Sequence, residues 1–338
     1  MNTGGFMTTV LYPESIYPDD NVERRVLGES VRVLRRDVAT LADLDAADCA
    51  ETDGLMVFRH WLSAADLARF PKVRAIVRMG VGYDRIDRAA AAARGVVVCN
   101  VPDYGTTEVA DHAIALMLAL RRGLLLHHDS QRAEPPAAWV ATNHPLLRRM
   151  GVQTFGVVGL GRIGTAAALR AKALGMRVVF YDPALPNGTE LALGIDRAAS
   201  LEALLRQTDA LSIHVPLTPA TKGMIGAAEL AMLRPNAVVV NTARGPVIDL
   251  DALEAAMRSG HVAGAGLDVL PVEPPAEPVP GLLRAYRARE PWQAGRLIIT
   301  PHSAYLTPEA FDDTRLKSAE TMRAALAGHP QNVIPPES

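Results

Sequence analysis

Three residues with catalytic potential lie in the second half of the chain, each shortly after an apolar run: Arg244, Glu273 and His302. If these runs are parallel strands, their carboxyl ends meet at one edge of a sheet, where ligands collect. There an arginine can bind an anion, a carboxylate can orient an imidazole ring, and a histidine can transfer a proton. Each also has a plain structural interpretation: a surface ion pair for Arg244, a loop acid for Glu273, and a capping or core position for His302.

A glycine-rich turn precedes these residues, between the apolar run 153–158 and an alanine-rich run. Gly159 allows a tight turn, Gly161 lets the backbone approach a pyrophosphate, and Gly164 lets the following helix pack closely on the strand. The start of that helix offers N–H groups and the positive end of a helix dipole. Asp182 ends the next predicted strand about twenty residues later, where a ribose-binding acid belongs. The pattern predicts a dinucleotide site, and glycines that serve packing alone are the alternative.

More polar residues follow the strands predicted for this half, and their clustering indicates a ligand site: Asp182, His214, Thr242 and Asp268. In the first half, a predicted strand ends at Arg78 and runs into a turn at Gly80, Val81 and Gly82. The N–H groups of such a turn could hold a carboxylate. A simple turn is the alternative.

The composition is that of an ordinary globular protein, with 49% hydrophobic and 21% charged residues in 338 positions. This length allows two domains with separate cores. The net charge of −2 and the lack of a long basic run argue against nucleic acid or a membrane surface as the partner. Small molecules are the expected ligands.

The cysteines and the histidines carry no pattern of a metal site. Cys49 and Cys99 lie far apart beside apolar segments, so we expect reduced packing residues, which fits a cytoplasmic protein. The histidines at 127, 128 and 144 have no acidic or cysteine partners at ligand spacing, so no metal is expected. The start of the chain lacks an export signal, and the most apolar predicted helix, 112–120, ends at two arginines.

Short apolar runs alternate with helix-like segments along the whole chain, which predicts two doubly wound α/β units. The first half contains five predicted strands, at 8–12, 31–34, 54–58, 75–79 and 96–100. The second half contains six, at 153–158, 176–182, 210–214, 237–241, 264–268 and 297–300.

Four other segments complete the prediction. Residues 108–121 form a helix, with Thr106 or Thr107 as its N-cap, that could carry the chain from one domain to the other. The irregular piece 122–150 is too long for a simple connection, so it is a candidate arm or partner surface. Residues 271–295 are rich in proline and arginine and are predicted to be a loop, and the tail 308–328 is predicted to be one helix.

The segments 241–245, 266–274 and 300–304 resemble signatures of the D-isomer-specific 2-hydroxyacid dehydrogenases. The resemblance covers nearly the whole chain. Within that family the sequence is most similar to the branch that includes the C-terminal binding protein corepressors. The segments that carry this similarity are 76–80, 99–102, 181–183 and 301–305.

This resemblance implies a Rossmann NAD-binding domain inserted into a flavodoxin-like substrate domain. The substrate domain would comprise residues 1–108 and 304–338, and the NAD-binding domain residues 109–303. It also implies an active site in the cleft and a homodimer, for which 122–150 is a candidate dimerisation arm. The expected partners are a small 2-oxo or 2-hydroxy acid and NAD.

Residue by residue, the resemblance implies that Arg244 holds the substrate carboxylate and polarises the 2-oxo group, that His302 is the proton donor or acceptor, and that Glu273 is its partner. Asp268 would contact the nicotinamide end. The other expected cofactor contacts are Gly159, Gly161, Arg162, Ile163, Gly164, Asp182, His214, Val215, Pro216, Thr221, Thr242 and Ala243. The expected substrate contacts, besides Arg244, are Arg78, Val81, Gly82 and Tyr305.

The sequence therefore predicts an NAD-dependent enzyme that interconverts a 2-oxo acid and a D-2-hydroxy acid. Alternatives are a nucleotide-sensing, corepressor-like binding protein and a phosphite dehydrogenase on the same fold. Formate is disfavoured because formate dehydrogenases of this fold use glutamine where Glu273 stands. The corepressors carry tryptophan in place of Tyr305, and 285–295 lengthens a loop. An aromatic wall is expected at the substrate side chain, from Tyr305 with His60, Trp61 and Trp292.

Overall fold

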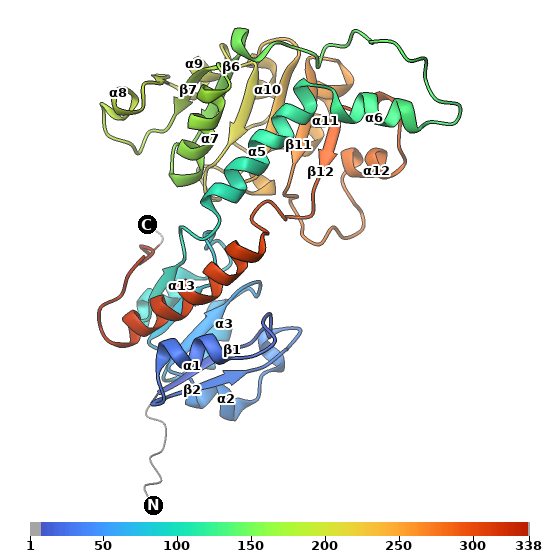
Figure 1. The fold of residues 1–338 in the computed structure, drawn as a ribbon. Coiled ribbons are helices and arrows are strands. Elements are labelled where there is room, and N and C mark those ends of the chain that lie inside the picture. The colour runs from blue at the N-terminus through green and yellow to red at the C-terminus, as the bar shows by residue number, and fades with distance from the viewer. Residues whose placement is uncertain (1–7, 337–338) are drawn as a thin grey trace, which may run out of the picture. The chain divides into compact units, whose positions relative to one another are not determined.

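The computed structural model describes residues 8–336, which form two compact units (Figure 1). Unit 1 contains residues 8–105 and 306–336, so segments from both ends of the chain build it, and unit 2 contains residues 106–305. The first domain boundary predicted from the sequence, at 108/109, lies three residues after the observed one. The second, at 303/304, lies two residues before the observed one. Each unit has its own parallel sheet, and the predicted fold class is confirmed.

Unit 1 is a five-stranded parallel sheet in the order β2-β1-β3-β4-β5. This is the flavodoxin-like order, in which the switch point lies between the first and third strands. The five strands match the five predicted from the sequence to within one or two residues: β1 (Thr8–Tyr12), β2 (Val31–Arg35), β3 (Gly54–Val57), β4 (Ala75–Arg78) and β5 (Val97–Asn100).

Helices cover both faces of the unit 1 sheet. On one face a buried apolar cluster joins the strands to α2, α3 and α4. On the other, α13 packs against β3, β4, β5 and α1. The helices of this unit are α1 (Asn21–Leu27), η1 (Leu41–Asp43), α2 (Ala46–Glu51), α3 (Ala64–Ala68), α4 (Arg88–Ala93) and α13 (Pro308–Leu326).

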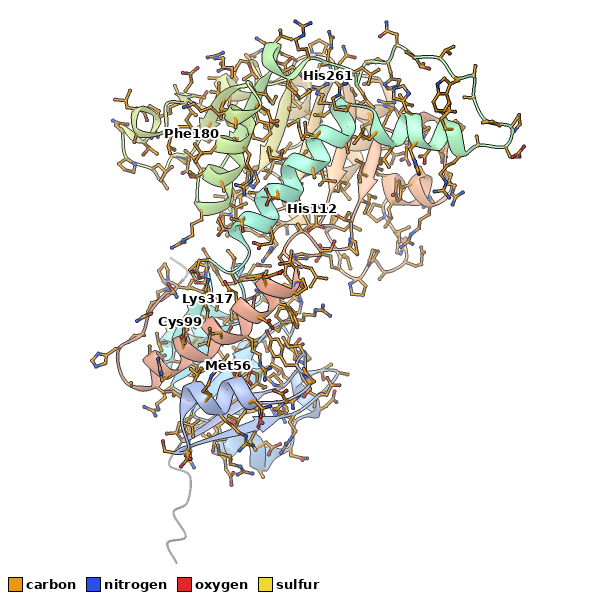
Figure 2. All side chains as sticks on the ribbon, in the orientation of Figure 1. Met56, Cys99, His112, Phe180, His261 and Lys317 are labelled. Atoms are coloured by element: carbon orange, nitrogen blue, oxygen red, sulfur yellow. The ribbon has the colours of Figure 1, made fainter. Side chains whose placement is uncertain are left out.

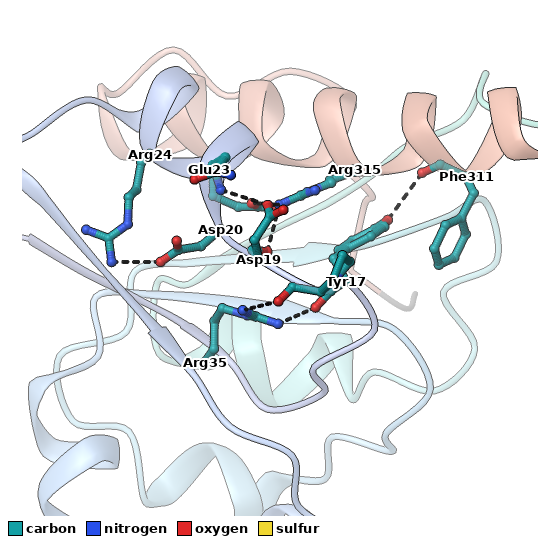
Figure 3. Close-up of polar contacts among 10 residues, drawn as sticks. Tyr17, Asp19, Asp20, Glu23, Arg24, Arg35, Phe311 and Arg315 are labelled. Atoms are coloured by element: carbon teal, nitrogen blue, oxygen red, sulfur yellow. Dashed lines mark hydrogen bonds and ion pairs between the residues drawn. The ribbon is translucent and has the colours of Figure 1, made fainter.

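An ion-pair cluster attaches the C-terminal helix to the N-terminal part of unit 1 (Figure 3). Nη2 of Arg315 on α13 lies 2.7 Å from Oε2 of Glu23 on α1 and 2.8 Å from Oδ1 of Asp19. The Glu23 side chain is only 3% exposed, and the Arg315 guanidinium lies 4.8 Å from the centre of the Tyr17 ring. These contacts explain how segments almost 300 positions apart in the sequence share one unit.

Unit 2 is a seven-stranded parallel sheet in the order β12-β11-β10-β9-β6-β7-β8. The order reverses between β6 and β9, the switch point at which Rossmann-type sheets bind ligands. The strands are β6 (Thr154–Val158), β7 (Arg177–Tyr181), β8 (Asp196–Arg197), β9 (Ala210–Ile213), β10 (Ala237–Asn241), β11 (Val262–Leu267) and β12 (Leu297–Ile299).

Two apolar cores flank the unit 2 sheet, because successive side chains of each strand point to opposite faces. One core contains residues of α5 and α7, and the other contains residues of α9, α10, α11 and α12. The helices are α5 (Thr106–Arg121), α6 (Leu124–Arg132), η2 (Met150–Val152), α7 (Arg162–Ala173), α8 (Thr189–Leu193), α9 (Leu201–Leu205), α10 (Ala227–Met232), η3 (Gly245–Val247), α11 (Leu250–Arg258), α12 (Gly281–Arg287) and η4 (Pro291–Gln293).

Several predicted elements were wrong in detail. The segment 271–295 is not one loop, because it contains α12 and η4, and α12 buries Leu282 and Leu283 in the core. Unit 2 has a seventh strand, β8, whose two residues are too few to show a periodic pattern. Neither Thr106 nor Thr107 is an N-cap, because α5 already begins at Thr106. Among the described residues, no helix is long and apolar enough to cross a membrane.

Candidate active site

The glycine turn at the end of β6 has the geometry that its sequence predicts. Gly159 has a φ of 86°, and a Cβ atom there would lie 2.8 Å from the carbonyl oxygen of His214. A Cβ atom on Gly164 would overlap the carbonyl oxygen of Gly159. At Gly161, by contrast, a Cβ atom would meet no heavy atom within 4 Å. Two glycines therefore allow close packing within the protein, and Gly161 leaves open space for a ligand.

Helix α7 begins directly after this turn, at Arg162, with Gly161 as its N-cap. The first N–H groups of an α-helix, here those of Arg162, Ile163 and Gly164, have no acceptor within the helix. The helix dipole adds partial positive charge at the same end. This end of α7 can therefore hold a diphosphate, as the sequence predicted.

Asp182 follows β7 and is fixed to the glycine turn by its side chain. Its Oδ2 accepts a hydrogen bond of 2.9 Å from the N–H of Leu160, and its Oδ1 accepts one of 2.9 Å from the N–H of Ala184. A carboxylate has about four lone-pair sites, so both oxygens can still accept hydrogen bonds from ribose hydroxyls. The two backbone contacts thus leave the carboxylate able to make the predicted hydrogen bonds to a ribose.

The loop after β9 packs against the same turn. Nε2 of His214 lies 2.8 Å from the Ser212 hydroxyl, and burial lowers the pKa of His214 to about 4, so its ring is neutral at neutral pH. A methyl of Val215 lies 2.7 Å from the position that a Cβ atom would take on Gly159. The Thr221 hydroxyl donates to the Pro216 carbonyl at 2.6 Å, so its hydrogen serves to hold the loop.

Thr242, at the end of β10, fits a dinucleotide for a different reason. Within residues 8–336, its hydroxyl oxygen is one of the buried side-chain atoms that have no hydrogen-bond partner. A buried polar group without a partner costs free energy, and a bound ligand can supply the partner. Together with the open space at Gly161 and the oriented Asp182, this hydroxyl fits a bound nicotinamide dinucleotide.

Arg244 is placed by the side chain of buried Asn241. The Asn241 Oδ1 accepts the N–H of Ala243 at 3.0 Å, and its Nδ2 donates to the Arg244 carbonyl at 2.9 Å. The next residue, Gly245, packs so tightly on the next loop that a Cβ atom would overlap the Leu270 carbonyl. This contact fixes the Arg244 loop against the loop that carries Glu273.

Glu273 and His302 form a direct pair. Nδ1 of His302 lies 2.6 Å from Oε2 of Glu273, and Oε1 of Glu273 accepts the N–H of Leu270 at 2.9 Å. Burial acts to raise the pKa of the Glu273 carboxyl, but the hydrogen bond and charge of His302, the Leu270 N–H and the charge of Arg244 outweigh it. The pKa of Glu273 is therefore below its usual value, and the carboxylate is ionised at neutral pH.

The Asp268 carboxylate holds the loop that carries His302 through hydrogen bonds. Asp268 is only 1% exposed, and its carboxylate accepts hydrogen bonds from the Thr300 hydroxyl at 2.6 Å and from the N–H groups of Ser303 and Ala304 at 2.9 and 3.0 Å. The backbone of His302 has a φ of 52°, which is uncommon for a residue with a side chain, and its N–H donates to the Asp268 carbonyl at 2.7 Å. Asp268 thus positions the histidine, and its contact with the nicotinamide end of the cofactor stays a prediction.

His112 extends this network and was not predicted as a site residue. It lies on α5 (Figure 2), and its Nε2 is 3.0 Å from the Thr300 hydroxyl. The signal available in the sequence was one histidine within the apolar residues of that helix. Because a histidine in such a helix is usually a packing residue, only the contact with Thr300 reveals its connection to Asp268.

Two members of the predicted aromatic wall, Tyr305 and Trp292, lie in unit 2. The Tyr305 ring lies beside His302, with ring centres 6.3 Å apart and an interplanar angle of 83°. Trp292 was wrongly included: its indole N–H donates to Glu290, and its ring lies 4.3 Å from the guanidinium of Arg258 at the end of α11. The end of α11 leads into the start of β11. Trp292 therefore lies at the amino ends of the strands, whereas His302 follows the carboxyl end of β12.

Unit 1 carries the other predicted site residues, at the carboxyl ends of its strands. Arg78 ends β4 and its Nη1 donates to the Met79 carbonyl at 3.0 Å. The carbonyl of Val81, in the turn that continues to Gly82, accepts a hydrogen bond of 2.7 Å from the side chain of Asn100. These contacts stabilise the turn after β4 that was predicted as a carboxylate cradle.

Two further residues of the predicted wall, His60 and Trp61, follow β3 in unit 1. Trp61 is 65% exposed, and its ring lies 5.8 Å from the guanidinium of Arg85. Nε2 of His60 is buried and has no hydrogen-bond partner in the described part of the chain. Nowhere between residues 8 and 336 do three or more His, Cys, Asp or Glu side chains gather as a metal ion would require.

Comparison with known proteins identifies the family. Residues 114–304 match the family model described as "D-isomer specific 2-hydroxyacid dehydrogenase, NAD binding domain". The chain is 36% identical over 282 residues to a glycerate dehydrogenase of Methylorubrum extorquens, which covers 82% of this chain and 84% of that protein. It is also 38% identical over 304 residues to a D-3-phosphoglycerate dehydrogenase of Mycobacterium leprae, covering 89% of this chain and 54% of that protein.

A solved structure agrees with these relatives. The crystal structure of a D-lactate dehydrogenase from Aquifex aeolicus, complexed with NAD and lactic acid, is 26% identical and covers 95% of this chain and 96% of that one, with a TM-score of 0.79. The chain spans about half the length of the phosphoglycerate dehydrogenases that it matches. The corepressor branch is not shown by these relatives and stays a prediction. The chain belongs to the D-isomer-specific 2-hydroxyacid dehydrogenase family.

Proposed function

We propose that the protein is an NAD-dependent oxidoreductase that interconverts a 2-oxo acid and a D-2-hydroxy acid. The observation that carries the proposal is the contact of 2.6 Å between His302 and an ionised Glu273, in the same unit as the dinucleotide turn. The cofactor, when bound, supplies or accepts the hydride. The side chains of the protein bind and orient the acid and move the proton.

Arg244 is the proposed anchor for the substrate. Its planar guanidinium can make paired charge-assisted hydrogen bonds to a carboxylate, and its positive charge can polarise a 2-oxo group. Its charge already acts on Glu273, which supports a position within the same catalytic cluster. The turn of Val81 and Gly82 and the side chain of Arg78 are proposed as the carboxylate contacts from unit 1.

The cofactor is proposed to be NAD rather than NADP. Each Asp182 oxygen is held by one backbone N–H and can accept a ribose hydroxyl, whereas its negative charge repels a 2′-phosphate. Equal catalytic efficiency with NADPH and NADH would reject this choice. Titration of the protein fluorescence with each cofactor measures the preference without any substrate.

The alternatives from the sequence are not favoured. A binding protein that uses the nucleotide only for assembly has no chemical need for Arg244, Glu273 and His302 to lie in one cluster. The named relatives are dehydrogenases of hydroxy acids, which argues against a phosphite enzyme as well. The names of the glycerate and phosphoglycerate dehydrogenases make hydroxypyruvate and related three-carbon acids worth including in any substrate screen.

We also propose a homodimer that uses the segment 122–150. The support is its exposed apolar surface: Trp139 is 91% exposed and Val140 is 70% exposed. Sedimentation of the wild type and of the double variant Trp139→Ser, Val140→Ser measures the assembly, and a wild type that sediments as a monomer rejects it. A cytoplasmic location is proposed because both cysteines are buried and unpaired.

A direct assay tests the proposed activity. NADH is mixed with a panel of 2-oxo acids and the loss of its absorbance is followed, with His302→Ala as the control protein. We expect wild-type turnover of at least one acid and almost none for the control. Binding of NADH without turnover of any acid, at any pH between 5 and 9, would contradict the enzyme and return the binding protein to first place.

A further inference from the structure

One arginine beside the dinucleotide site has no part in the function described so far. Arg197 is the second residue of β8, at the edge of the unit 2 sheet, and it pairs with Phe180 on β7 (Phe180 is labelled in Figure 2). Its guanidinium lies 4.8 Å from the centre of the Phe180 ring. β7 ends at Tyr181, directly before the proposed ribose acid Asp182.

The Arg197 guanidinium holds the backbone that follows Asp182. Its Nη1 donates to the carbonyls of Asp182 and Leu185, both at 3.3 Å, and its Nη2 donates to the Pro186 carbonyl at 2.7 Å. Three carbonyls of one short loop, residues 182–186, therefore point at a single cation. The loop is fixed in the conformation in which the N–H of Ala184 reaches the carboxylate of Asp182.

Glu190, in the first turn of α8, completes this arrangement. Its Oε2 accepts a hydrogen bond of 2.9 Å from Nε of Arg197, and its Oε1 accepts the N–H of Gly188 at 3.1 Å. Backbone hydrogen bonding at its own residue, followed by the hydrogen bond from Arg197, lowers the pKa of Glu190. The carboxylate is therefore ionised at neutral pH, and it neutralises the one cation that is hydrogen-bonded to the Asp182 backbone among the residues described.

We propose that Glu190 and Arg197 together set the choice of cofactor. This inference rests on the proposed dinucleotide site and deepens it. In dinucleotide folds an arginine near the ribose accommodates the 2′-phosphate of NADP. Here an arginine lies next to the ribose acid, but Glu190 and three carbonyls occupy it, so its charge is withheld from a 2′-phosphate. The same contacts hold Asp182 in position for the two hydroxyls of NAD.

The key variant is Glu190→Gln, which keeps the size of the side chain and one accepting oxygen but removes the negative charge. The positive charge of Arg197 is then uncompensated and attracts a 2′-phosphate. We expect the ratio of the NADPH to the NADH dissociation constant to fall about tenfold, which is the size of one hydrogen bond to a charged group. The gain should vanish in the double variant Glu190→Gln, Arg197→Leu, because it requires the arginine.

Removing the arginine alone tests its second role, which is to hold the Asp182 loop in position for NAD. Arg197→Leu should raise the dissociation constant of NADH several-fold and bring no gain for NADPH. Arg197→Lys keeps a cation but loses the fork, so it should restore part of the NADH affinity. The matched control is Asp196→Asn, which breaks the exposed ion pair with Arg177 on the same strand pair and should change neither constant.

All dissociation constants are measured by fluorescence on the full chain, without substrate. If the wild type binds NADH and Glu190→Gln leaves the ratio unchanged, or the double variant keeps the gain, the inference fails while the proposed function stands. If the wild type binds neither cofactor, both fail together. Circular dichroism confirms that each variant is folded, and Glu190→Gln alone suffices for the decision should Arg197→Leu not fold.

Discussion

Nδ1 of His302 lies 2.6 Å from Oε2 of Glu273, and this contact determines which ring nitrogen is available for chemistry. An ionised carboxylate only accepts hydrogen bonds, so Nδ1 must carry a hydrogen atom. Nε2 is then the nitrogen that can exchange a proton with a substrate oxygen. The carboxylate also stabilises the positive charge that the ring carries when it is ready to donate.

The first prediction concerns the pH dependence of this pair. His302→Ala should lower turnover roughly 10²- to 10⁴-fold, as loss of general acid catalysis does. Glu273→Gln should move the limb of the pH–rate profile for 2-oxo acid reduction to lower pH, because the protonated ring loses its negative partner. Glu277→Gln, an exposed acid of the same loop, is the control. An identical profile for Glu273→Gln and the wild type would refute the pairing.

The second prediction concerns the support beneath His302. The Thr300 hydroxyl has one hydrogen, which it gives to the Asp268 carboxylate, so Nε2 of His112 must be the donor in its own contact with that hydroxyl. Thr300→Val removes both bonds. We expect kcat to fall by about 10- to 100-fold, since small displacements of a catalytic group cost this much.

The conservative variant separates positioning from packing. Thr300→Ser keeps the hydroxyl and loses only a methyl group, so it should retain most of the activity. The kcat of His112→Phe should fall between those of the two Thr300 variants. This variant breaks the hydrogen bond between His112 and Thr300 and leaves the one between Thr300 and Asp268. If Thr300→Ser were as inactive as Thr300→Val, the hydroxyl would not be the cause.

Much of this site could be predicted because its signals are local. The turn at Gly159 and the acid at Asp182 follow from the types and spacing of a few residues around one strand, one helix and the next strand. The features that the sequence did not reveal depend on contacts between residues that lie far apart in the chain. The resemblance implies a nicotinamide contact for Asp268, and its hydrogen bonds to residues 300–304 add a structural role that the sequence does not reveal. Trp292 was placed in the pocket from an irregular segment that in fact contains α12 and η4.

The third prediction concerns the attachment of the C-terminal helix. Arg315→Met leaves the nearly buried carboxylate of Glu23 without its partner. Breaking a buried ion pair on one side usually costs about 3–5 kcal/mol, so we expect the free energy of unfolding of unit 1 to fall by that amount. Urea unfolding measures it. Arg24→Ala breaks the exposed pair with Asp20 and should change little. Equal effects of the two variants would contradict this reading of the cluster.

The fourth prediction uses His214, whose pKa burial lowers to about 4. An unfolded histidine has a pKa near 6.5, so between these values the unfolded state binds more protons than the folded state. The stability of unit 2 should therefore fall as the pH drops from about 6.5 toward 4. The contribution of this histidine is at most on the order of 3 kcal/mol.

Replacing His214 isolates its share of the stability that unit 2 loses at acidic pH. His214→Gln does not titrate, so its urea unfolding free energy should change less between pH 7 and pH 5 than that of the wild type. His261→Gln, at a different loop, should keep the wild-type dependence. The same slope in the wild type and in His214→Gln would exclude His214 as a source.

The last prediction concerns the side chain of the substrate. Tyr305 is a member of the predicted aromatic wall, and its ring lies beside His302, nearly perpendicular to the imidazole. An aromatic ring there favours an apolar or aromatic side chain larger than methyl over a second carboxylate. We expect higher catalytic efficiency with phenylpyruvate or a branched 2-oxo acid than with glyoxylate or a dicarboxylic 2-oxo acid. Tyr305→Ala should lower the efficiency for phenylpyruvate about 2- to 10-fold, the range for one aromatic contact, and leave glyoxylate unaffected. A clear preference of the wild type for glyoxylate, hydroxypyruvate or a dicarboxylic acid rejects the aromatic pocket, and an equal loss for both acids in Tyr305→Ala shows that the ring supports His302 instead of the substrate.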